Sequence, residues 1–417
     1  MLSRPKSLQI VAVFAALVLL AAACSSRDSA DVAAIGAEST DAQLGQQETV
    51  VATIEPAPTF PGPASFDRPS SAIYQRDSPE FPAPLIDLDE LLSGGPPPDG
   101  ITPLDEPAYI TVDEVNFLAP QDSVLVLEVN GEAKALPTQI MIWHEIANTE
   151  VGGVPITVSY CPLCNSAVAF PRTHADGTVM DFGTSGLLYR SSLVMYDRQT
   201  STLWTHLDGQ AVHGVMAGNE LDLLPVSTVS FADFAEAHPD GLVLSRDTGL
   251  SRQYGINPYS GYDSNGRGGT MYPAEFDDSR AVALARVLAV RSDASIAVFH
   301  EFLLEERVVA IELDGVPLVV LLQPGTASAL QAGQVALGRD VGATGVFETT
   351  VDGRELSFVP IDEGGFTDEQ TGSTWNIFGL AVEGELAGTG LQAVEHLDTF
   401  WFAIATFRPD TVLVGAG

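Results

Sequence analysis

The chain has 417 residues, of which 45% are apolar, and its formal net charge is −36. This length has room for two ordinary domains, and the apolar content is sufficient to form a buried core. Lysine occurs only at Lys6 and Lys134. So acidic a surface repels phosphate backbones, which argues against nucleic acid as a partner. The same charge disfavours docking on anionic lipid.

The N-terminus has the pattern of an export signal. Arg4 and Lys6 precede an apolar run from Ile10 to Leu20, which is too short to favour a permanent membrane span. Three alanines then lead to Cys24, and this sequence resembles a bacterial lipobox. We therefore predict that residues 1–23 are a signal peptide and that Cys24 is lipidated. The protein is then exported and lipid-anchored at the outer face of the cell membrane; an ordinary signal peptide cleaved near Cys24 is the alternative.

Residues 24–100 are predicted to be a disordered tether. They are rich in Pro, Ser, Asp and Glu and show little apolar periodicity. Such a composition does not bury enough surface to offset the entropy of the chain. Within this segment, Leu85 to Leu92 is predicted to form a short docking element. Regular order is expected from Ile101.

The first part of the ordered region predicts strands with one helix. Asn130 and Gly131 favour a tight turn between two strands, and the apolar spacing from Thr138 to Asn148 predicts a helix. The Cys-Pro-Leu-Cys segment, residues 161–164, then lies on a tight turn between two further strands. The predicted strands cover residues 124–129, 134–136, 156–160 and 167–170.

Matching motifs recur at nearly fixed spacing in two parts of the chain. The segment Thr200–Trp204 is echoed by Thr371–Trp375, and Asn130-Gly131 is echoed by Asp314-Gly315. Matches spread this widely are typical of an internal repeat. We predict an α+β, β-rich fold of two repeated halves of short strands with a few helices. The predicted segments are 101–250 for the first half, 251–299 for a Tyr- and Gly-rich connector, and 300–417 for a degenerate second half that acts as scaffold.

Two predictions about side chains follow from the repeat and its neighbourhood. Trp204 and Trp375 occupy matching places and are therefore predicted to be core residues. Asp197 and Arg198, adjacent in the sequence, are predicted to pair with each other.

The second half keeps the frame of the first but lacks its reactive residues. Arg339 to Gly342 stand about where the first half has the Cys turn, and Glu383 stands where His213 stands. A residue that the second half lacks, although the repeated motifs persist there, is not needed for the fold that the two halves share. This comparison favours a functional role for Cys161, Cys164 and His213.

Specific motifs fill the stretch from Trp143 to Gly218 and continue near the C-terminus. They read WHE, NTxVGGxPxxVxYCPLCNSAVAF, DFGTSGLLYRSSLVMYDRQTSTLW and GxAVHGxMAG, and later TGSTWNIFGLAVEGELAG and FWFAIATFRPDT. These motifs resemble those of the domain-of-unknown-function 3179 family, and the resemblance spans roughly residues 110–415. It implies an exported or lipid-anchored bacterial or archaeal protein of a family with no established activity.

The Cys turn predicts a metal site. A CPxC knuckle supplies two thiolates to zinc or iron, and because a full zinc ribbon needs a second knuckle, the remaining ligands must be other side chains. Thiolates and imidazoles suit zinc, copper or iron, and a methionine sulfur is a weaker axial ligand for copper. The predicted ligands are Cys161, Cys164, His144, His206 and His213, with Met195 in the axial role.

Other interpretations of the same residues stay open. Cys161 and Cys164 also suit the reversible disulfide of a thiol–disulfide surface protein, although no βαβ pattern surrounds them, or a purely structural disulfide. Glu145 is the candidate catalytic residue, as a proton acceptor, and a solvated carboxylate is its alternative. A non-enzymatic binding module would instead use the loop Tyr254–Tyr262 to contact a glycan or protein. The sequence does not specify the small-molecule or protein partner.

Overall fold

The computed structural model describes residues 71–415 except 175, 265–268, 273–275 and 363. The predicted signal peptide, Cys24 and the predicted tether up to residue 70 lie outside the described residues. Within the described part of the chain, no helix is long and apolar enough to cross a membrane.

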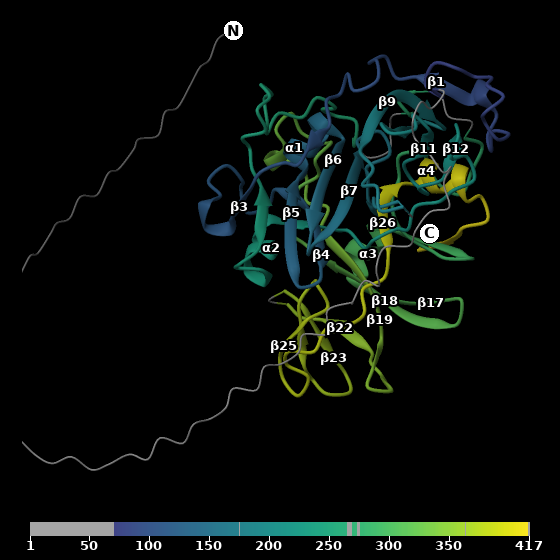
Figure 1. Cartoon of the computed structure of the whole chain (residues 1–417). Helices are drawn as coiled ribbons and strands as arrows, with labels where there is room; N and C mark the ends of the chain where they lie inside the picture. Colours follow the sequence, from purple (N-terminus) through teal and green to yellow (C-terminus); the bar gives the residue numbers. More distant parts are fainter. Residues whose placement is uncertain (1–70, 175, 265–268, 273–275, 363, 416–417) are drawn as a thin grey trace, which may run out of the picture. The chain divides into compact units, whose positions relative to one another are not determined.

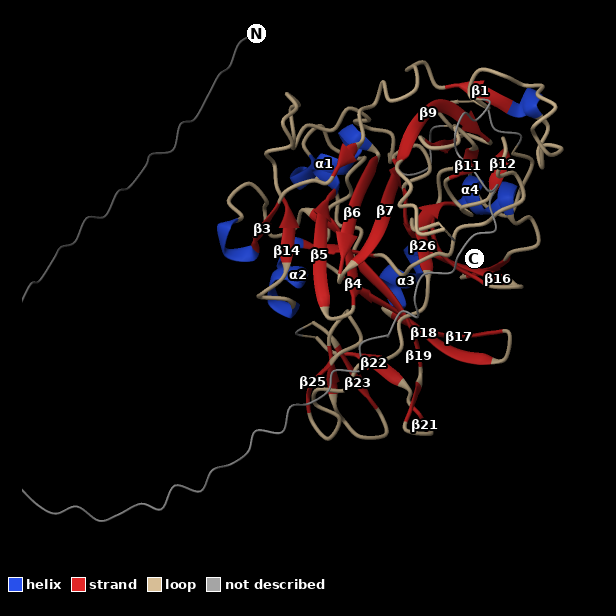
Figure 2. Ribbon diagram, in the orientation of Figure 1, coloured by secondary structure: helices blue, strands red, loops and turns tan. Residues whose placement is uncertain are grey.

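Short strands dominate the described residues, and helices are few (Figures 1 and 2). This confirms the predicted β-rich fold with a few helices. The α-helices described have seven residues each and are α1 (Thr138–His144), α2 (Phe231–Ala237), α3 (His300–Glu306) and α4 (Trp401–Phe407). Single 3₁₀ turns form η1 (Leu88–Glu90), η2 (Val112–Glu114) and η3 (Val335–Leu337).

The strands between residues 91 and 244 form three sheets. The first has the order β1 (Leu91–Ser93), β9 (Phe182–Tyr189), β10 (Ser192–Asp197), β11 (Leu203–Thr205), β12 (Ala211–His213). The second has the order β13 (Ser227–Ser230), β4 (Ser123–Val129), β5 (Glu132–Pro137), β14 (Leu242–Leu244), β3 (Tyr109–Thr111). The third has the order β2 (Leu104–Asp105), β6 (Ile146–Val151), β7 (Val154–Cys161), β8 (Ser166–Pro171).

The strands between residues 286 and 414 form four more sheets. One has the order β26 (His396–Phe400), β15 (Arg286–Arg291), β16 (Ser295–Phe299), β27 (Val412–Val414), and another has β17 (Val308–Leu313), β18 (Val316–Gln323), β19 (Ala343–Glu348). A hairpin pairs β20 (Thr350–Val351) with β21 (Arg354–Glu355). The last sheet has the order β22 (Phe358–Pro360), β23 (Phe366–Asp368), β24 (Thr374–Trp375), β25 (Ala381–Glu383).

Two of these sheets share one strand order. The strands β13, β4, β5 and β14 lie side by side in one, and β26, β15, β16 and β27 do so in the other. In both, the first three are antiparallel neighbours and the fourth runs parallel to the third. The third strand then leads into a short helix, α1 or α3, and each helix ends at a residue with positive φ, 60° at Glu145 and 62° at Arg307.

A buried tryptophan is held by an aspartate in each of two hairpins. Nε1 of Trp204 donates to Oδ2 of Asp197 at 2.9 Å, and Nε1 of Trp375 donates to Oδ2 of Asp368 at 2.9 Å. Both indoles have an exposed fraction of 0%, which confirms that both are core residues. The hydrogen bonds satisfy the indole N–H groups that burial removes from water.

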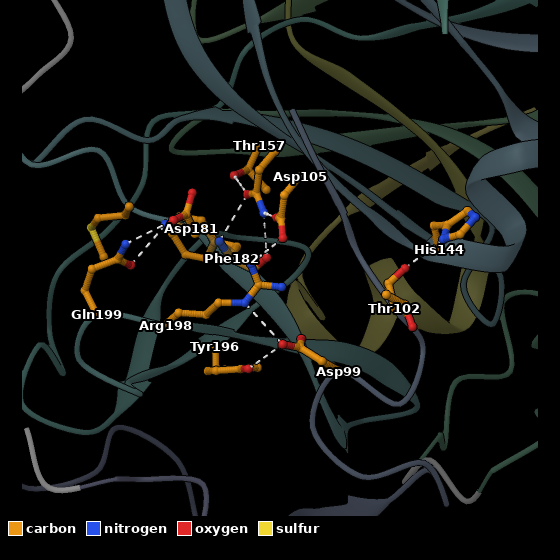
Figure 3. A network of polar contacts seen from close by, with 12 residues as sticks. Asp99, Thr102, Asp105, His144, Thr157, Asp181, Phe182, Tyr196, Arg198 and Gln199 are labelled. Atoms are coloured by element: carbon orange, nitrogen blue, oxygen red, sulfur yellow. Dashed lines mark hydrogen bonds and ion pairs between the residues drawn. The ribbon is translucent and has the colours of Figure 1, made fainter. Parts of the chain in front are cut away.

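The prediction that Asp197 and Arg198 pair with each other is wrong. Asp197 is the last residue of β10 and Arg198 is the first residue after it, and the two side chains bond different partners. The Asp197 carboxylate faces the core, whereas Arg198 donates from Nε to Asp99 at 3.1 Å and from Nη1 to Asp105 at 2.8 Å (Figure 3).

The predicted helix of residues 138–148 is too long. α1 ends at His144, and Ile146 already belongs to β6. Glu145 adopts a positive φ, which reverses the chain, and its carbonyl accepts from the N–H of Tyr160 in β7 at 2.7 Å. Ile146 and Ala147 are buried as residues of β6.

The predicted tether extends further along the chain than the structure allows. Residues 71–100 are described, and β1 pairs with β9 from Leu91 opposite Tyr189 to Ser93 opposite Leu187. The docking element predicted at Leu85–Leu92 corresponds to η1 and the start of β1. Composition alone missed this pairing because the contact partner lies about a hundred residues away.

The β7–β8 hairpin, at one edge of the third sheet, carries the Cys turn. Cys161 ends β7, and both cysteines belong to the largest apolar cluster, which also contains Val158 of β7 and Trp401 of α4. The turn is therefore packed between strands from the first part of the chain and a helix from the last part.

Candidate functional site

A tight hairpin turn positions the two cysteines. Cys161 lies opposite Ser166 in the β7–β8 ladder, so the turn consists of residues 162–165. The N–H of Asn165 donates to the carbonyl of Pro162 at 3.3 Å, and Asn165 has a φ of 52°, a conformation that asparagine tolerates better than most residues. The predicted position of the CPLC segment between two strands is confirmed.

Residues far along the chain hold this turn in place. The Cys164 carbonyl accepts from the N–H of Phe400 at 3.0 Å and from Oγ1 of Thr399 at 2.8 Å. The Leu163 carbonyl accepts from the hydroxyl of Tyr262 at 2.9 Å. Because these donors come from β26, from the start of α4 and from the connector, the segments predicted as scaffold and linker contact the turn directly.

The two thiols are free and differ in their surroundings. Cys161 and Cys164 have exposed fractions of 1% and 0%. Sγ of Cys164 lies 3.0 Å from Oγ of Ser166 and 3.4 Å from Oγ of Ser192. Burial raises the pKa of the Cys164 thiol, but hydrogen bonds from Cys161, Ser166 and Ser192 outweigh burial and bring this pKa below its ordinary value.

The Cys161 thiol is shifted in the opposite direction. Burial raises its pKa, and so do the hydrogen bond it makes to Cys164 and the negative charge there. The backbone N–H of Leu193 opposes this shift by donating to Cys161. In the reduced pair, the proton therefore resides on Cys161 and the thiolate character on Cys164.

A histidine continues the polar network behind Cys164. Nε2 of His206 lies 2.8 Å from Oγ of Ser166, and Nδ1 lies 2.8 Å from Oγ of Ser159. Burial, together with the positive charge of Arg291, lowers the pKa of His206 to about 3, so its imidazole is neutral at physiological pH. A neutral imidazole that donates to Ser166 leaves the Ser166 proton free to point at Cys164.

A pocket of about 110 Å³ lies on the other side of the turn and reaches Cys161. It runs from Met271, which is 51% exposed, to Cys161 and Glu145, which are buried. Cys164 is not among the residues that line it. The lining residues are Gly94, Pro96, Ile101, Glu145, Cys161, Leu163, Thr184, Gly186, Leu187, Leu188, Leu193, Tyr259, Met271 and Tyr272.

Glu145 is the acidic group of this pocket. Its exposed fraction is 6%, and Oε1 accepts from the hydroxyl of Tyr259 at 3.3 Å. Burial raises the pKa of Glu145 to about 8, with a further increase from the charge of Cys161 and a decrease from Tyr259. The carboxyl group is therefore mostly protonated at pH 7 and able to exchange a proton near neutrality.

The tyrosines of the connector turn towards the site instead of towards solvent. The Tyr254 hydroxyl lies 2.6 Å from Nε2 of His144, and the Tyr272 hydroxyl donates to the Gly94 carbonyl at 2.8 Å. With Tyr259 on Glu145 and Tyr262 on Leu163, four connector tyrosines make polar contacts around the turn or its pocket. Tyr254 is buried and Tyr259 and Tyr262 are partly buried, and the use of this loop as a binding surface stays a prediction.

The segment 94–105 forms the facing wall, and a polar network fixes it to β9 and β10 (Figure 3). Asp99 accepts from the Tyr196 hydroxyl at 2.8 Å as well as from Arg198. Thr184 donates from Oγ1 to the carbonyl of Ile101 at 2.8 Å. Gly186 must be glycine here, because it has a φ of 74° and a Cβ would meet the carbonyl oxygen of Pro96.

The predicted metal ligands are not brought together. Nδ1 of His144 lies 2.7 Å from the Thr102 carbonyl and its other nitrogen faces Tyr254, while both nitrogens of His206 face serines. Nε2 of His213 contacts the carbonyl of Gln75 at 3.1 Å. Met195 is a buried residue of β10. Among the described residues, no group of three or more His, Cys, Asp or Glu side chains is placed to hold a metal ion, so this arrangement gives the metal prediction no support.

Comparison with known proteins identifies the family but not the activity. The family model described as "Protein of unknown function (DUF3179)" matches residues 98–411. The chain belongs to this family. The match covers the Cys turn, the connector and the last helix, and it confirms the resemblance inferred from the motifs. No curated protein and no solved structure matches this member of the DUF3179 family.

Sequence reasoning missed several residues of the site. Ser166 follows Cys164 by two positions and begins β8, and this closeness in the sequence could have indicated it. Ser192 and Tyr259 lie 28 and 95 positions beyond Cys164 and have no local signal that links them to the turn. Only the folded sheet order brings them to the sulfurs and to Glu145.

Proposed function

We propose that this protein carries out thiol–disulfide exchange, with Cys161 and Cys164 passing between a dithiol and a disulfide. The observation that carries the proposal is the difference between the two thiols: Cys161 lines a pocket beside Glu145, whereas Cys164 lies behind it within a shell of hydroxyl donors. A pair in which one sulfur meets the substrate and the other waits to resolve the mixed disulfide needs this asymmetry.

The surroundings of Cys164 support its role as the resolving thiolate. Ser166 and Ser192 stabilise a negative sulfur, and the neutral His206 keeps Ser166 oriented. Attack on a disulfide requires a thiolate, and lowering the pKa increases the fraction of thiolate at neutral pH. A purely structural pair would not require hydroxyl donors at one sulfur.

Glu145 supports the role of Cys161. In the oxidising direction, the ionised fraction of Glu145 accepts the proton of Cys161, and the Cys161 thiolate attacks one sulfur of a disulfide RS–SR. The S–S bond breaks, the first RS⁻ leaves with the electron pair, and Glu145 returns the proton to it. Cys164, as the thiolate, then attacks Sγ of Cys161, the second RS⁻ leaves with the electron pair, and the protein disulfide forms. Two electrons thus move from the pair to RS–SR, while one proton comes from Cys161 through Glu145 and the other from solvent, giving two RSH.

Export supports a role in thiol chemistry outside the cytoplasm. We propose that Cys24 is lipidated and that the folded part acts at the outer face of the membrane, where free thiols do not persist unless a redox partner maintains them. After lipidation of Cys24, the sequence contains no thiol except Cys161 and Cys164.

We further infer that the folded part is a duplication of one unit, with Arg286 rather than residue 300 near the start of the second copy. The shared strand order of β13-β4-β5-β14 and β26-β15-β16-β27 supports this, as do the matched Asp–Trp hairpins. In that alignment, Arg307 stands at the place of Glu145 and Gln323 at the place of Cys161, because Leu322 bonds the Arg307 carbonyl as Tyr160 bonds that of Glu145. The second copy therefore has neither the acid nor the thiol.

The test is redox equilibration of the full-length protein in glutathione buffers, read by mass spectrometry of the Cys161–Cys164 peptide. We expect a reversible bond with a potential near that of glutathione. In the Cys164→Ser variant, a mixed disulfide should accumulate on Cys161, whereas Cys161→Ser should form none under the same conditions. A bond that survives excess mild reductant would reduce the pair to a structural disulfide, and bound metal that protects both thiols would favour the metal prediction.

A further inference from the structure

We infer that the pocket selects small, uncharged aliphatic disulfides and the corresponding thiols, and excludes anionic ones. This inference rests on the proposed thiol–disulfide exchange and names its substrate class. Three observations support the inference: the pocket itself, the position of the Cys161 sulfur at its buried end, and the composition of its walls.

The walls are largely apolar. Ile101, Leu163, Leu187, Leu188 and Leu193 contribute aliphatic side chains, and the exposed end is formed by Met271. Burial of apolar ligand surface against such side chains is favourable, whereas a charged group placed there loses its hydration. The walls therefore favour an aliphatic substituent on the sulfur.

The polar groups of the pocket offer little to an anion. The hydroxyls of Thr184, Tyr259 and Tyr272 already donate to the Ile101 carbonyl, to Glu145 and to the Gly94 carbonyl. Among the residues that the structure describes, none that lines the pocket is Lys, Arg or His. A carboxylate on the substrate would thus enter without a positive partner and without a free hydroxyl donor.

Charge at longer range acts in the same direction. The chain carries a formal net charge of −36, and the Cys161–Glu145 pair adds one negative charge at the pocket, on the Glu145 carboxylate before the proton transfer and on the Cys161 sulfur after it. An anionic disulfide meets repulsion both on approach and in the pocket, which lowers its rate of association. A cationic disulfide is attracted on approach but loses hydration against the apolar walls.

The volume limits the size of the group that enters. A cavity of roughly 150 Å³ holds a benzene ring, so the present pocket of about 110 Å³ has room for a group of a few heavy atoms. One arm of a small aliphatic disulfide fits this description. The second arm would extend past Met271 to solvent.

The experiment compares three small disulfides of similar size and different charge. Reduced full-length protein is mixed with hydroxyethyl disulfide, which is uncharged, with cystamine, which is cationic, or with dithiodipropionate, which is anionic. Formation of the Cys161–Cys164 bond is followed by quenched mass spectrometry, and each rate is divided by the rate of the same disulfide with free dithiothreitol. We expect the normalised rate of the uncharged compound to exceed that of the anionic one at least about tenfold.

A matched pair of rim variants tests the electrostatic cause. Met271→Lys places a cation at the exposed end of the pocket, and Met271→Leu keeps that position uncharged. The ratio of anionic to uncharged rate should be several-fold higher in Met271→Lys than in Met271→Leu, and added salt should reduce this difference.

The outcomes separate the substrate class from the underlying function. If all three compounds oxidise the pair at equal normalised rates, or the anionic one is fastest, the substrate class is wrong while the exchange activity stands. If none oxidises the pair although unfolded protein reacts, the proposed function is wrong and the substrate class fails with it.

Discussion

Cys161 and Cys164 share one turn, yet their thiols have pKa values shifted in opposite directions. Both are buried, so burial alone does not explain the difference. The difference arises because Cys164 accepts hydrogen bonds from Cys161 and two serines, whereas Cys161 keeps its proton and donates a hydrogen bond to Cys164. The hydroxyl groups around one sulfur therefore decide which of the two carries the negative charge.

Removing these hydroxyls should raise the pKa of Cys164. A hydrogen bond to a charged group contributes about 1.5–3 kcal/mol, so Ser166→Ala should raise the thiolate pKa by about one to two units, and Ser192→Ala, with the longer contact, by less. The measurement is thiolate absorbance against pH in the reduced protein. Ser159→Ala is the matched control, because Ser159 contacts His206 and not the sulfur. An unchanged titration in Ser166→Ala would show that this serine does not stabilise the thiolate.

Glu145 should make the stability of the fold depend on pH. Its pKa is raised from the ordinary value of 4.5 to about 8 in the folded protein, so the folded state holds a proton that the unfolded state has released. The stabilisation is complete below the unfolded pKa, decreases as the pH rises above 4.5, and is lost above about 8. Urea unfolding of the wild type between these pH values should show falling stability, and Glu145→Gln should flatten that slope. A variant with the same slope as the wild type would contradict the assignment.

The Cys turn is an element held from two sides. Its own strands, β7 and β8, determine its register, and β26, the start of α4 and the connector supply donors to its carbonyls. A tight turn between strands leaves carbonyl groups outside the ladder, and buried carbonyls of this kind need partners. Thr399, Phe400 and Tyr262 provide them.

Loss of one of these donors should loosen the turn without unfolding the protein. Thr399→Val removes the hydroxyl that bonds the Cys164 carbonyl and should lower stability by about 1 kcal/mol, because a buried acceptor loses one of its two partners. The rate of Cys161 alkylation in the folded protein should increase at the same time. Thr406→Val, which removes two hydroxyl bonds within α4, is the control for stability and should leave the alkylation rate unchanged. Equal alkylation rates in the two variants would show that the Thr399 hydroxyl does not hold the Cys turn in place.

Local sequence patterns were sufficient to predict some of the strands and turns around the site. Asn130 and Gly131 predict the β4–β5 hairpin, and both adopt the positive φ that such a turn requires. The alternation of apolar residues before Cys161 predicts β7, and the position of Trp204 predicts burial. These features depend on neighbours in sequence, so they can be read without the fold.

The rest of the site depends on contacts between distant residues. The sequence offers three histidines near the cysteines, but the fold directs each of them to other partners, such as Tyr254 for His144 and Ser166 for His206. The contact of Thr399 with Cys164 joins residues 235 positions apart. No periodicity encodes such a pairing, which explains why the thiol pair was predicted while its surroundings were not.

Among the described residues, the two tryptophans that bond an aspartate lie in different apolar clusters. Trp204 belongs to the cluster that contains both cysteines, and Trp375 belongs to a second cluster that contains neither. The two tryptophans make the same bond to an aspartate, but burial raises the pKa of Asp197, whereas hydrogen bonds that include the one from Trp375 lower that of Asp368 despite burial. The same Asp–Trp hydrogen bond therefore occurs in two different electrostatic environments.

Truncation of Trp375 should separate stability from thiol chemistry. Trp375→Ala removes a fully buried indole and should lower stability by roughly 3–5 kcal/mol. Because the Trp375 cluster does not contain the Cys turn, the redox potential of the folded variant should equal that of the wild type. Denaturant unfolding and glutathione equilibration measure the two quantities. A shifted potential would mean that the second cluster contributes to the site.

The large negative charge should make stability sensitive to salt. Repulsion among acidic side chains opposes the compact state, and added salt screens it. The thermal midpoint should therefore rise by a few degrees between low and moderate sodium chloride. A neutral osmolyte at matched osmolality is the control, because it does not screen charge. A midpoint that is constant or falls with salt would contradict this expectation.

The bond from the Phe400 amide to the Cys164 carbonyl has a spectroscopic consequence. Formation of the Cys161–Cys164 disulfide reorients the peptide groups of the turn. The Phe400 amide belongs to another sheet and is hydrogen-bonded to the carbonyl of one of these peptide groups, that of Cys164. The rate at which the Phe400 amide exchanges with deuterium should therefore differ between the dithiol and disulfide forms. The exchange rate of the Val290 amide, in the neighbouring strand β15, should be the same in both forms. A single backbone proton near the C-terminus would then report the oxidation state of two sulfurs in the first half of the chain.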